Sequence, residues 1–213
     1  MQFTTIFFDL DNTLYPASTG LWQVLKERMN SYMRERVGIS EHDIPALRER
    51  YFREYGTTLR GLQANHPVDA QDFLAYVHDV PLADYLQPDP VQRAVLASLS
   101  TRNIIFTNSD LAHTRRVLDR LHIAEFFADV LDVNRMDPYC KPDPAAFALA
   151  MSIAGEPDPH KCVMIDDLPH TTRAARELGL FAVLYGTDLP PADADAALTD
   201  WRALPALLDG ARA

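Results

Sequence analysis

Residues 3–13 of this 213-residue chain read FTTIFFDLDNT, an apolar run that ends in a cluster of polar side chains. Every residue of the first part, FTTIFF, is β-branched or aromatic, and these residue types are enriched in strands. Because the run has apolar side chains on both faces, it is typical of a strand buried on both sides, as in parallel sheets. We therefore expect residues 3–8 to form a strand inside a parallel sheet.

Four similar runs occur farther along the chain, and a helical pattern precedes each of them. Strand–helix alternation of this kind is typical of an α/β fold, a doubly wound parallel sheet with right-handed crossovers. The expected strands are 103–106, 129–133, 162–165 and 180–184, and the expected helices are 89–99, 110–121, 143–153 and 170–178. One further apolar helix face, which we expect to close the core, consists of Trp201, Leu204, Leu207 and Leu208.

The interval between the first and second expected strands is too long for a simple crossover. About ninety residues without a strand pattern separate the two strands, whereas a βαβ crossover needs far fewer. Helical patterns cover 20–36, 41–55 and 69–78. We therefore predict an inserted helical subdomain at 16–86, with 1–15 and 87–213 forming the α/β core.

The composition is that of an ordinary globular protein, and it limits the kind of partner. Hydrophobic residues make up 47% of the chain, charged residues make up 23%, and the formal net charge is −10. Such an acidic chain disfavours nucleic acids and anionic membranes, because these are bound through lysine and arginine. The insert has eight basic and ten acidic residues, a net charge of −2, so it can approach an anionic small molecule with little repulsion.

The cysteine content and the N-terminal sequence indicate a cytoplasmic protein. The chain has two cysteines, Cys140 and Cys162, whereas a disulfide framework normally needs more. The first residues contain no basic segment, and no apolar run approaches the ~18 residues of a membrane span. We therefore expect reduced thiols, no targeting segment and no transmembrane helix.

Two carboxylates follow the first expected strand. Asp9 and Asp11 are two residues apart, so their side chains point the same way in an extended chain. Two like charges so close are unfavourable unless they share a cation or a proton. A calcium-binding EF-hand loop is excluded, because Leu14 stands where glycine is required and Gly20 where glutamate is required. A turn or a helix cap is the structural alternative.

Two further polar groups suit the binding of a phosphate. Thr107 and Asn108 come directly after the strand at 103–106, where hydroxyl, amide and backbone N–H groups meet the start of a helix and can hold an anion. Lys141 precedes Pro142, which suits the first turn of a helix, and a lysine there can neutralise a phosphate as a point cation. The alternatives are an ordinary helix cap and a solvated surface lysine.

A second pair of acids, Asp166 and Asp167, follows the strand at 162–165. Carboxylates are hard ligands that suit Mg²⁺, although this pair could also cap the next helix. All four groups stand at or just beyond the C-terminal ends of expected strands, and in one parallel sheet those ends share one edge. Independent helix caps give no reason for four carboxylates, a lysine and a Thr-Asn pair to gather in one crevice.

These residues match the motifs of a known family. The chain resembles the phosphatases of the haloacid dehalogenase (HAD) superfamily, and the resemblance covers nearly the whole chain. The family motifs appear here, in family order, as Asp9-x-Asp11-x-Thr13, Thr107, Lys141 and Asp166-Asp167. The stretches FFDLDNTLYPASTGL (7–21) and YGTTLRGL (55–62) are similar to the pyrimidine 5′-nucleotidase branch. The resemblance implies that the insert at 16–86 is a helical cap that closes over the site.

The resemblance also implies a role for each matched residue. Asp9 attacks phosphorus, Asp11 acts as the general acid–base, and Lys141 belongs to the catalytic set. The phosphoryl group is held by Thr107, Asn108 and Lys141. The implied cofactor is Mg²⁺, and its ligands are Asp9, Asp11 (through its backbone carbonyl), Asp167, and Asp166 (directly or through water).

Thr171 departs from the family pattern, and Arg60 is a candidate substrate contact outside the matched motifs. Many relatives carry a further acid four residues after the metal-binding aspartate, and here that position is Thr171, a departure that concerns the outer support of the metal and not the catalytic core. Arg60 lies in the YGTTLRGL stretch and is our candidate for a cap residue that contacts substrate. A surface arginine near a helix end is the alternative.

The implied chemistry sets a requirement on Asp11. A carboxylate that attacks a phosphate dianion meets repulsion, which Mg²⁺ and Lys141 offset. Asp11 must first give a proton to the leaving alkoxide and later take one from water, so we expect its surroundings to raise its pKa. The resemblance implies that dehalogenases of this fold lack the second acid, so Asp11 favours the hydrolysis of phosphate esters.

We therefore expect a Mg²⁺-dependent phosphatase that hydrolyses small phosphate monoesters, in particular nucleoside 5′-monophosphates, through an aspartyl-phosphate. Its partner would be a small phosphate ester, not a nucleic acid or a membrane, and it would be a monomer or a homodimer. The alternatives are other phosphometabolites such as sugar phosphates, a phosphomutase, a 2-haloacid dehalogenase, and a non-enzymatic module that binds phosphate ligands.

Overall fold

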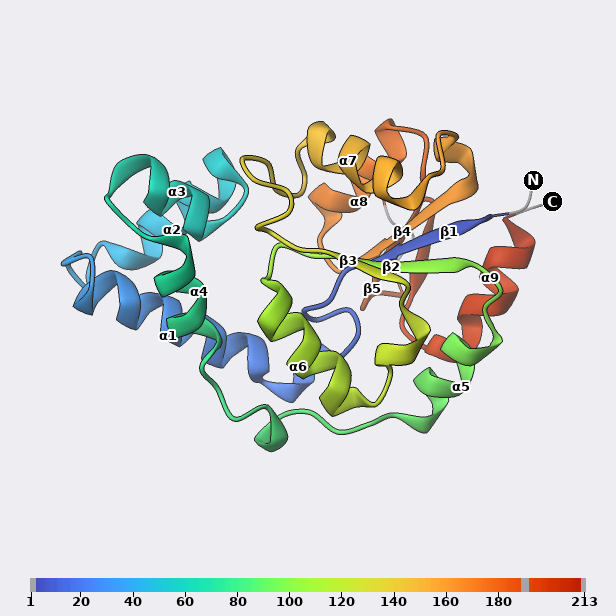
Figure 1. The fold of residues 1–213 in the computed structure, drawn as a ribbon, viewed down its shortest axis with the longest axis horizontal. Coiled ribbons are helices and arrows are strands. Elements are labelled where there is room, and N and C mark those ends of the chain that lie inside the picture. Colours follow the sequence, from blue (N-terminus) through green and yellow to red (C-terminus); the bar gives the residue numbers. More distant parts are fainter. Residues whose placement is uncertain (1–2, 189–191, 212–213) are drawn as a thin grey trace. The chain divides into compact units, whose positions relative to one another are not determined.

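The structure, a computed structural model, describes residues 3–188 and 192–211. Contacts between residues divide the chain into two compact units. The first unit runs up to Ala17 and resumes at Leu86, and the second is Ser18–Tyr85 (Figure 1).

The first unit is built on one parallel sheet. Its strands, among the described residues, are β1 (Thr5–Phe8), β2 (Arg102–Phe106), β3 (Asp129–Leu131), β4 (Cys162–Asp166), β5 (Phe181–Tyr185) and β6 (Ala196–Leu198). They lie in the order β3-β2-β1-β4-β5-β6, and each neighbouring pair is parallel. The chain therefore adds strands on one side of β1 and then returns to place β4 on the other side. In open α/β sheets, such a reversal creates a crevice at the carboxyl ends of the strands, where ligands bind.

Helices cover both faces of this sheet. Figure 1 shows α7 and α8 on one face and α5, α6 and α9 on the other. Their bounds are α5 (Pro90–Ser98), α6 (Leu111–Leu121), α7 (Pro144–Ala154), α8 (Pro169–Glu177) and α9 (Leu204–Gly210). Helices α5, α6 and α7 begin after an aspartate whose side chain accepts a hydrogen bond from a backbone N–H of the first turn. The predicted doubly wound α/β fold is confirmed.

The central strand β1 contributes to the packing on both faces. The Phe7 ring packs edge-on against Phe106, which in turn packs edge-on against Phe147 of α7. The Phe8 ring packs against Trp201, in the short 3₁₀ turn before α9. Because successive residues of a strand point to opposite faces, adjacent phenylalanines anchor the two hydrophobic layers. Both rings are fully buried, as a strand apolar on both faces requires.

The second unit is helical. Its helices, within the part of the chain that the structure describes, are α1 (Leu21–Glu35), α2 (Ile44–Tyr55), α3 (Thr58–Asn65) and α4 (Ala70–His78). Helix α1 packs mainly with α4, and α2 packs mainly with α3. None of the helices described in either unit is both long enough and apolar enough to cross a membrane.

Two elements were missing from the sequence-based prediction. Strand β6 has three residues, Ala-Ala-Leu, and alanine has little preference for strands. Helix α3 is eight residues long and contains a glycine. Its N-terminus is stabilised by Thr57, whose hydroxyl accepts a hydrogen bond from the backbone N–H of Arg60 at 3.1 Å. Both elements are short and carry weak local signals.

Candidate active site

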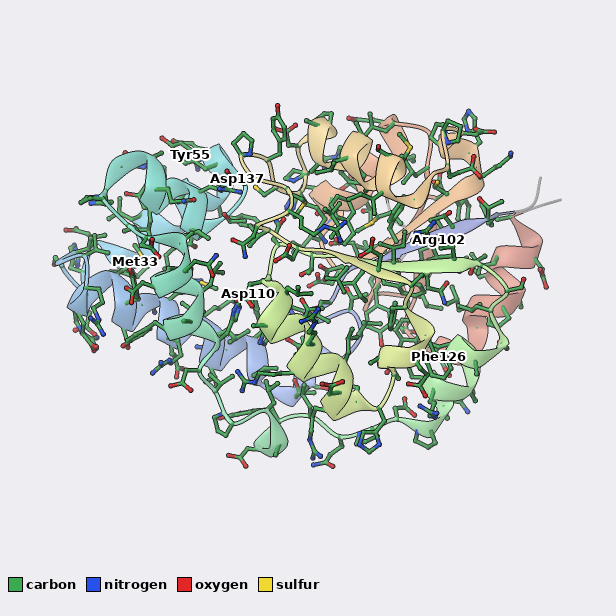
Figure 2. The ribbon with its side chains drawn as sticks, viewed as in Figure 1. Met33, Tyr55, Arg102, Asp110, Phe126 and Asp137 are labelled. Atoms are coloured by element: carbon green, nitrogen blue, oxygen red, sulfur yellow. The ribbon has the colours of Figure 1, made fainter. Side chains whose placement is uncertain are left out.

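The candidate site lies at the carboxyl ends of β1 and β4, where the strand order reverses. Asp9 directly follows β1, and its backbone N–H donates to the carbonyl oxygen of Ile165 at 2.9 Å. Asp166 is the last residue of β4, and Asp167 comes next. In Figure 2, Arg102 marks the start of the neighbouring strand β2, and Asp110 marks the start of α6 beyond the other end of that strand. The sheet topology therefore brings the two predicted acidic motifs together.

Three carboxylates gather at this edge. Asp9, Asp166 and Asp167 each offer one oxygen, and these oxygens lie within 4.8 Å of one another. Asp9 and Asp166 are buried, and Asp167 is half-buried. Oxygen ligands grouped in this way are what Mg²⁺ binds in proteins.

Lys141 lies between two of these carboxylates. Its ammonium group donates to Asp9 Oδ1 and to Asp166 Oδ2, both at 2.7 Å. Burial alone would lower the pKa of Lys141, but the charges of Asp166 and Asp9 outweigh it and hold the pKa above the ordinary value. Asn108 fixes the backbone of Lys141 through two hydrogen bonds, because its Oδ1 accepts from the Lys141 N–H (2.9 Å) and its Nδ2 donates to the Lys141 carbonyl (3.0 Å).

The charge of this cluster is not balanced by the lysine alone. Burial raises the pKa of Asp9 well above its usual value, and Asp166, Asp167 and Asp11 add to the effect, which Lys141 only partly offsets. Burial and then the charge of Asp166 raise the pKa of Asp167 to about 7. Carboxylates that resist ionisation in this way are stabilised when a cation binds among them.

The residues present fit a divalent cation. Asn12 adopts a left-handed backbone conformation (φ 61°), and its amide nitrogen donates to Asp167 Oδ2 at 3.3 Å. Its amide oxygen is buried and accepts no hydrogen bond from the described residues. An amide oxygen is a suitable acceptor for a metal-bound water or a suitable ligand for the ion itself. The donor set is therefore all oxygen, as Mg²⁺ prefers.

Asp11 lies in a different environment from the other three acids. Its Oδ1 accepts hydrogen bonds from the Tyr15 hydroxyl (2.6 Å) and from His113 Nε2 (3.2 Å), and its Oδ2 accepts from the Ser109 hydroxyl (2.5 Å). Burial would raise the pKa of Asp11, but the hydrogen bond and charge of His113, and then Ser109 and Tyr15, hold it well below its usual value. The expectation of a raised pKa was therefore wrong for this structure, because three donors stabilise the ionised form.

A profile of the haloacid dehalogenase-like hydrolase family matches residues 3–201. The chain belongs to this family. Among curated proteins it is similar to "Phosphate metabolism protein 8" of Saccharomyces cerevisiae (strain ATCC 204508 / S288c), with 30% identity over 193 residues. The match covers 84% of this chain, and the chain spans 60% of the length of that relative.

Solved structures of this hydrolase family share the fold. A HAD phosphatase from Thermococcus onnurineus matches with a TM-score of 0.65 and 18% identity, covering 99% of this chain and 100% of that chain. L-2-haloacid dehalogenase from Xanthobacter autotrophicus matches with a TM-score of 0.61 and 18% identity, covering 98% and 99%. Since one fold carries both reactions, the fold alone does not select between them.

The remaining residues predicted for this HAD-like hydrolase belong to two different units: Thr107 and Thr13 to the α/β unit, and Arg60 to the helical unit. Thr107 is buried directly after β2, and its hydroxyl accepts a hydrogen bond from the Ser109 N–H at 3.1 Å. Thr13 donates to Asp9 Oδ2 at 3.1 Å. Arg60 belongs to the helical unit, where its guanidinium donates to Gln63 Oε1 at 3.1 Å, and its contact with substrate stays a prediction.

Sequence reasoning missed the partners of Asp11 in this hydrolase. Ser109 follows the predicted phosphate-binding pair Thr107 and Asn108, and its contact with Asp11 was not foreseen. The next helix is capped by Asp110, whose carboxylate accepts from the backbone N–H of His113 at 2.8 Å. Tyr15 lies four residues after Asp11, and His113 lies in the first turn of α6. The position of His113 was the sequence signal that could have predicted this contact, because the first turn of α6 follows the carboxyl end of β2.

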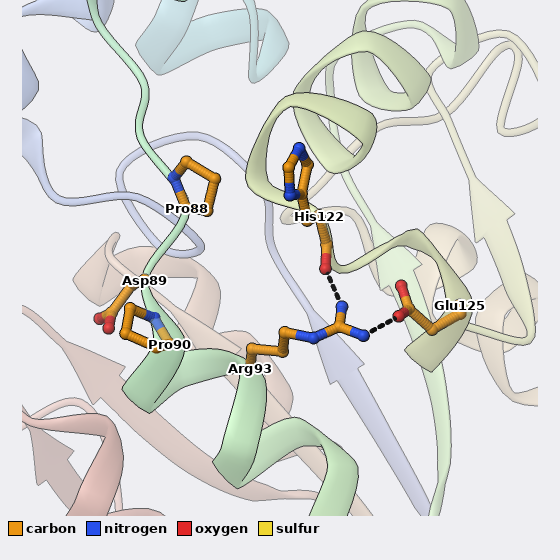
Figure 3. Close-up of a pocket in the computed structure, with 6 residues that line it drawn as sticks. All are labelled: Pro88, Asp89, Pro90, Arg93, His122 and Glu125. Carbon is orange, nitrogen blue, oxygen red and sulfur yellow. Dashed lines mark hydrogen bonds and ion pairs between the residues drawn. The ribbon is translucent and has the colours of Figure 1, made fainter.

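A separate pocket of about 410 Å³ lies between the start of α5 and the end of α6. Figure 3 shows its lining, where Arg93 donates to the carbonyl oxygen of His122 and forms an ion pair with Glu125. None of the predicted site residues lines it. Its one cation is already paired, so the pocket does not compete with the acid cluster as a phosphate site.

Proposed function

We propose that this hydrolase is a Mg²⁺-dependent phosphatase that acts on small phosphate monoesters through an aspartyl-phosphate at Asp9. The observation that carries the proposal is the buried ammonium group of Lys141, 2.7 Å from both Asp9 and Asp166, inside a cluster of three carboxylates. A nucleophilic carboxylate beside a fixed cation and a divalent-metal site is what attack on a phosphate dianion requires.

Asp9, Asp166 and Asp167 would hold the Mg²⁺ ion, together with the backbone carbonyl of Asp11. When bound, the ion offsets the charge of the carboxylates and of the phosphate and polarises the phosphoryl group. Thr171 does not supply an acid to support the ion, and its hydroxyl is buried with no hydrogen-bond partner among the described residues.

In the first step, a carboxylate oxygen of Asp9 bonds to phosphorus, and the bond from phosphorus to the ester oxygen breaks. Lys141 stabilises the charge that develops on the phosphoryl oxygens, and Thr107 and Asn108 hold the group in place. The leaving oxygen takes a proton from Asp11. The approach of a phosphate dianion favours this protonated form, because a nearby negative charge raises the pKa of a carboxylic acid.

In the second step, water attacks the phosphorus of the aspartyl-phosphate and gives a proton to Asp11, which is now ionised and acts as the base. Phosphate then leaves, and Asp9 is regenerated. The three hydrogen bonds that Asp11 accepts keep it ionised, which is the protonation state from which this step starts.

We propose nucleoside 5′-monophosphates, and pyrimidine nucleotides in particular, as substrates. The stretches at 7–21 and 55–62 support this branch, and the name of the yeast relative agrees with phosphate chemistry. The unit Ser18–Tyr85 would act as the cap that selects the substrate, with Arg60 as a contact. Sugar phosphates are the alternative substrates for the same site.

Asp11 argues against the dehalogenase alternative. A carboxylate near the nucleophile can act as the general acid when a leaving alkoxide needs a proton. A leaving halide needs no proton, so a dehalogenase would not require this group. A phosphomutase would use the same residues but would require a bisphosphate for turnover.

The test is a panel of phosphate monoesters assayed with Mg²⁺ and with chelator. We expect phosphate release from UMP or CMP only with Mg²⁺, with turnover abolished in Asp9→Asn and Asp11→Asn and largely kept in Thr171→Ala. Equal loss in all three variants would show that the roles are misassigned. No phosphate release over the whole panel would support a binding module instead.

A further inference from the structure

The Asp11 carboxylate accepts more side-chain hydrogen bonds than any other acid of the described site. Tyr15 and His113 donate to one oxygen, and Ser109 donates to the other. An ionised carboxylate can only accept, so His113 must carry a hydrogen on Nε2. Three donors on two oxygens fix both the position and the rotation of the carboxylate plane.

The donors are less accessible than the carboxylate that they hold. The His113 side chain is 0% exposed, whereas the Asp11 side chain is 11% exposed. Tyr15 and Ser109 are also buried. His113 therefore cannot reach a substrate, and any effect that it has on the reaction must act through Asp11.

Two of the donors, His113 and Ser109, have backbones that are themselves held by hydrogen bonds. The backbone N–H of His113 is held by the Asp110 carboxylate at 2.8 Å. The backbone of Ser109 is held on both sides, since its N–H donates to Thr107 Oγ1 (3.1 Å) and its carbonyl accepts from the Val133 N–H (3.1 Å). A side chain held by groups that are fixed in turn keeps one geometry, which is what a proton-transfer group needs.

We propose that Tyr15, Ser109 and His113 are positioning residues that hold the Asp11 carboxylate in reach of the leaving-group oxygen. The inference rests on the proposed function, in which Asp11 is the general acid–base. A general acid must lie within about 2.6–3.2 Å of the atom that it protonates. Loss of a donor widens the range of χ angles that the Asp11 side chain samples, and the fraction of time in that geometry falls.

Leaving-group dependence tests this role, because a merely structural role does not alter it. p-Nitrophenolate leaves without a proton, whereas an alkoxide needs one. The rate constant to measure is that for release of the first product in a single turnover at subsaturating substrate. For Tyr15→Phe, Ser109→Ala and His113→Leu we expect a loss of about 10- to 100-fold with the best alkyl monophosphate of the panel, but of less than about threefold with p-nitrophenyl phosphate.

Two matched variants serve as controls. His113→Gln places an amide N–H near the position of Nε2 and should recover most of the lost rate with the alkyl ester. Ser98→Ala removes a hydroxyl hydrogen bond elsewhere in the α/β unit, from Ser98 Oγ to the carbonyl oxygen of Val95 at 2.7 Å in α5, and should leave both rates unchanged. Thermal unfolding confirms that each variant is folded, and three separate donors keep the test decisive if one variant is not.

Asp11→Asn distinguishes failure of the acid role of Asp11 from failure of the positioning role of its three donors. If this variant shows no selective loss with the alkyl ester, the acid role in the proposed function fails. If Asp11→Asn shows the selective loss, but the donor variants slow both substrates equally or neither, the positioning role is overturned. Selective loss in Asp11→Asn and in the donor variants, with recovery in His113→Gln, supports both.

Discussion

At the scale of single residues, charge balance governs the candidate site. Lys141 supplies one positive charge between Asp9 and Asp166, and its side chain is only 4% exposed. A buried charge is tolerated only when it is paired, so the lysine and the two carboxylates depend on one another. Asp167 adds a further carboxylate, and burial, followed by the charge of Asp166, raises its pKa.

Asp167 leads to a prediction about pH. Its pKa of about 7 in the metal-free fold lies above the value of about 3.9 in an unfolded chain, so the folded state binds the extra proton. The stability from this proton is fully present below about pH 4 and is lost as the pH rises to about 7. Mg²⁺ needs the ionised form, so we expect its binding at pH 6 to release protons and to tighten as the pH rises.

Calorimetric titration of the protein with Mg²⁺ in two buffers of different ionisation enthalpy measures this release. The apparent binding enthalpy should differ between the buffers at pH 6 and converge by pH 8, where Asp167 is ionised. Identical enthalpies at pH 6 would mean that no proton is displaced and that the carboxylates of the site are already ionised.

The residue scale also shows what the sequence could and could not predict about the site. Asp9, Asp166 and Asp167 were predictable as a group, because each follows an apolar run and parallel strands share one carboxyl edge. The low pKa of Asp11 was not predictable. Its donors come from positions 15, 109 and 113, and the register of two segments far apart in the sequence decides whether they meet.

At the scale of elements, long patterns were predictable and short ones were not. β1 was predictable because six consecutive residues favour a strand, and α5 and α6 were predictable from apolar residues at helical spacing. β6 and α3 are short, and their place depends on tertiary contacts. The pairing of α2 with α3 depends on Gly61, which has no side chain at the closest approach to Tyr51.

Substitution of Gly61 should destabilise the contact between α2 and α3. A Cβ atom at position 61 would lie 2.2 Å from Tyr51 Cγ, so Gly61→Ala must push the two helices apart. We expect the free energy of unfolding to fall by about 1–3 kcal/mol, as for other overpacked cores. Gly210→Ala, near the end of α9, is the control, because a Cβ there meets nothing within 4 Å. Urea unfolding of both variants measures the difference, and equal stability would refute the close α2–α3 contact.

At the scale of the whole molecule, we assign the chemistry and the choice of substrate to different units. The parallel sheet and its helices hold every residue that we assign to the chemistry, and the helical unit holds Arg60, which we assign to substrate choice. This division explains why the chemistry was easier to infer than the substrate. The strand edge restricts where carboxylates can gather, whereas a helical unit has no comparable rule for which side chains meet a ligand.

The proposed mechanism requires that Asp9 becomes phosphorylated, and acid quenching during turnover detects this intermediate. The protein is mixed with Mg²⁺ and its best phosphate monoester and quenched in acid, and the peptide that contains residues 3–13 is analysed by mass spectrometry. We expect an acyl phosphate on Asp9 that borohydride removes and that Asp9→Asn never forms. Phosphate on another residue, or steady turnover with no phosphorylated peptide, would contradict it.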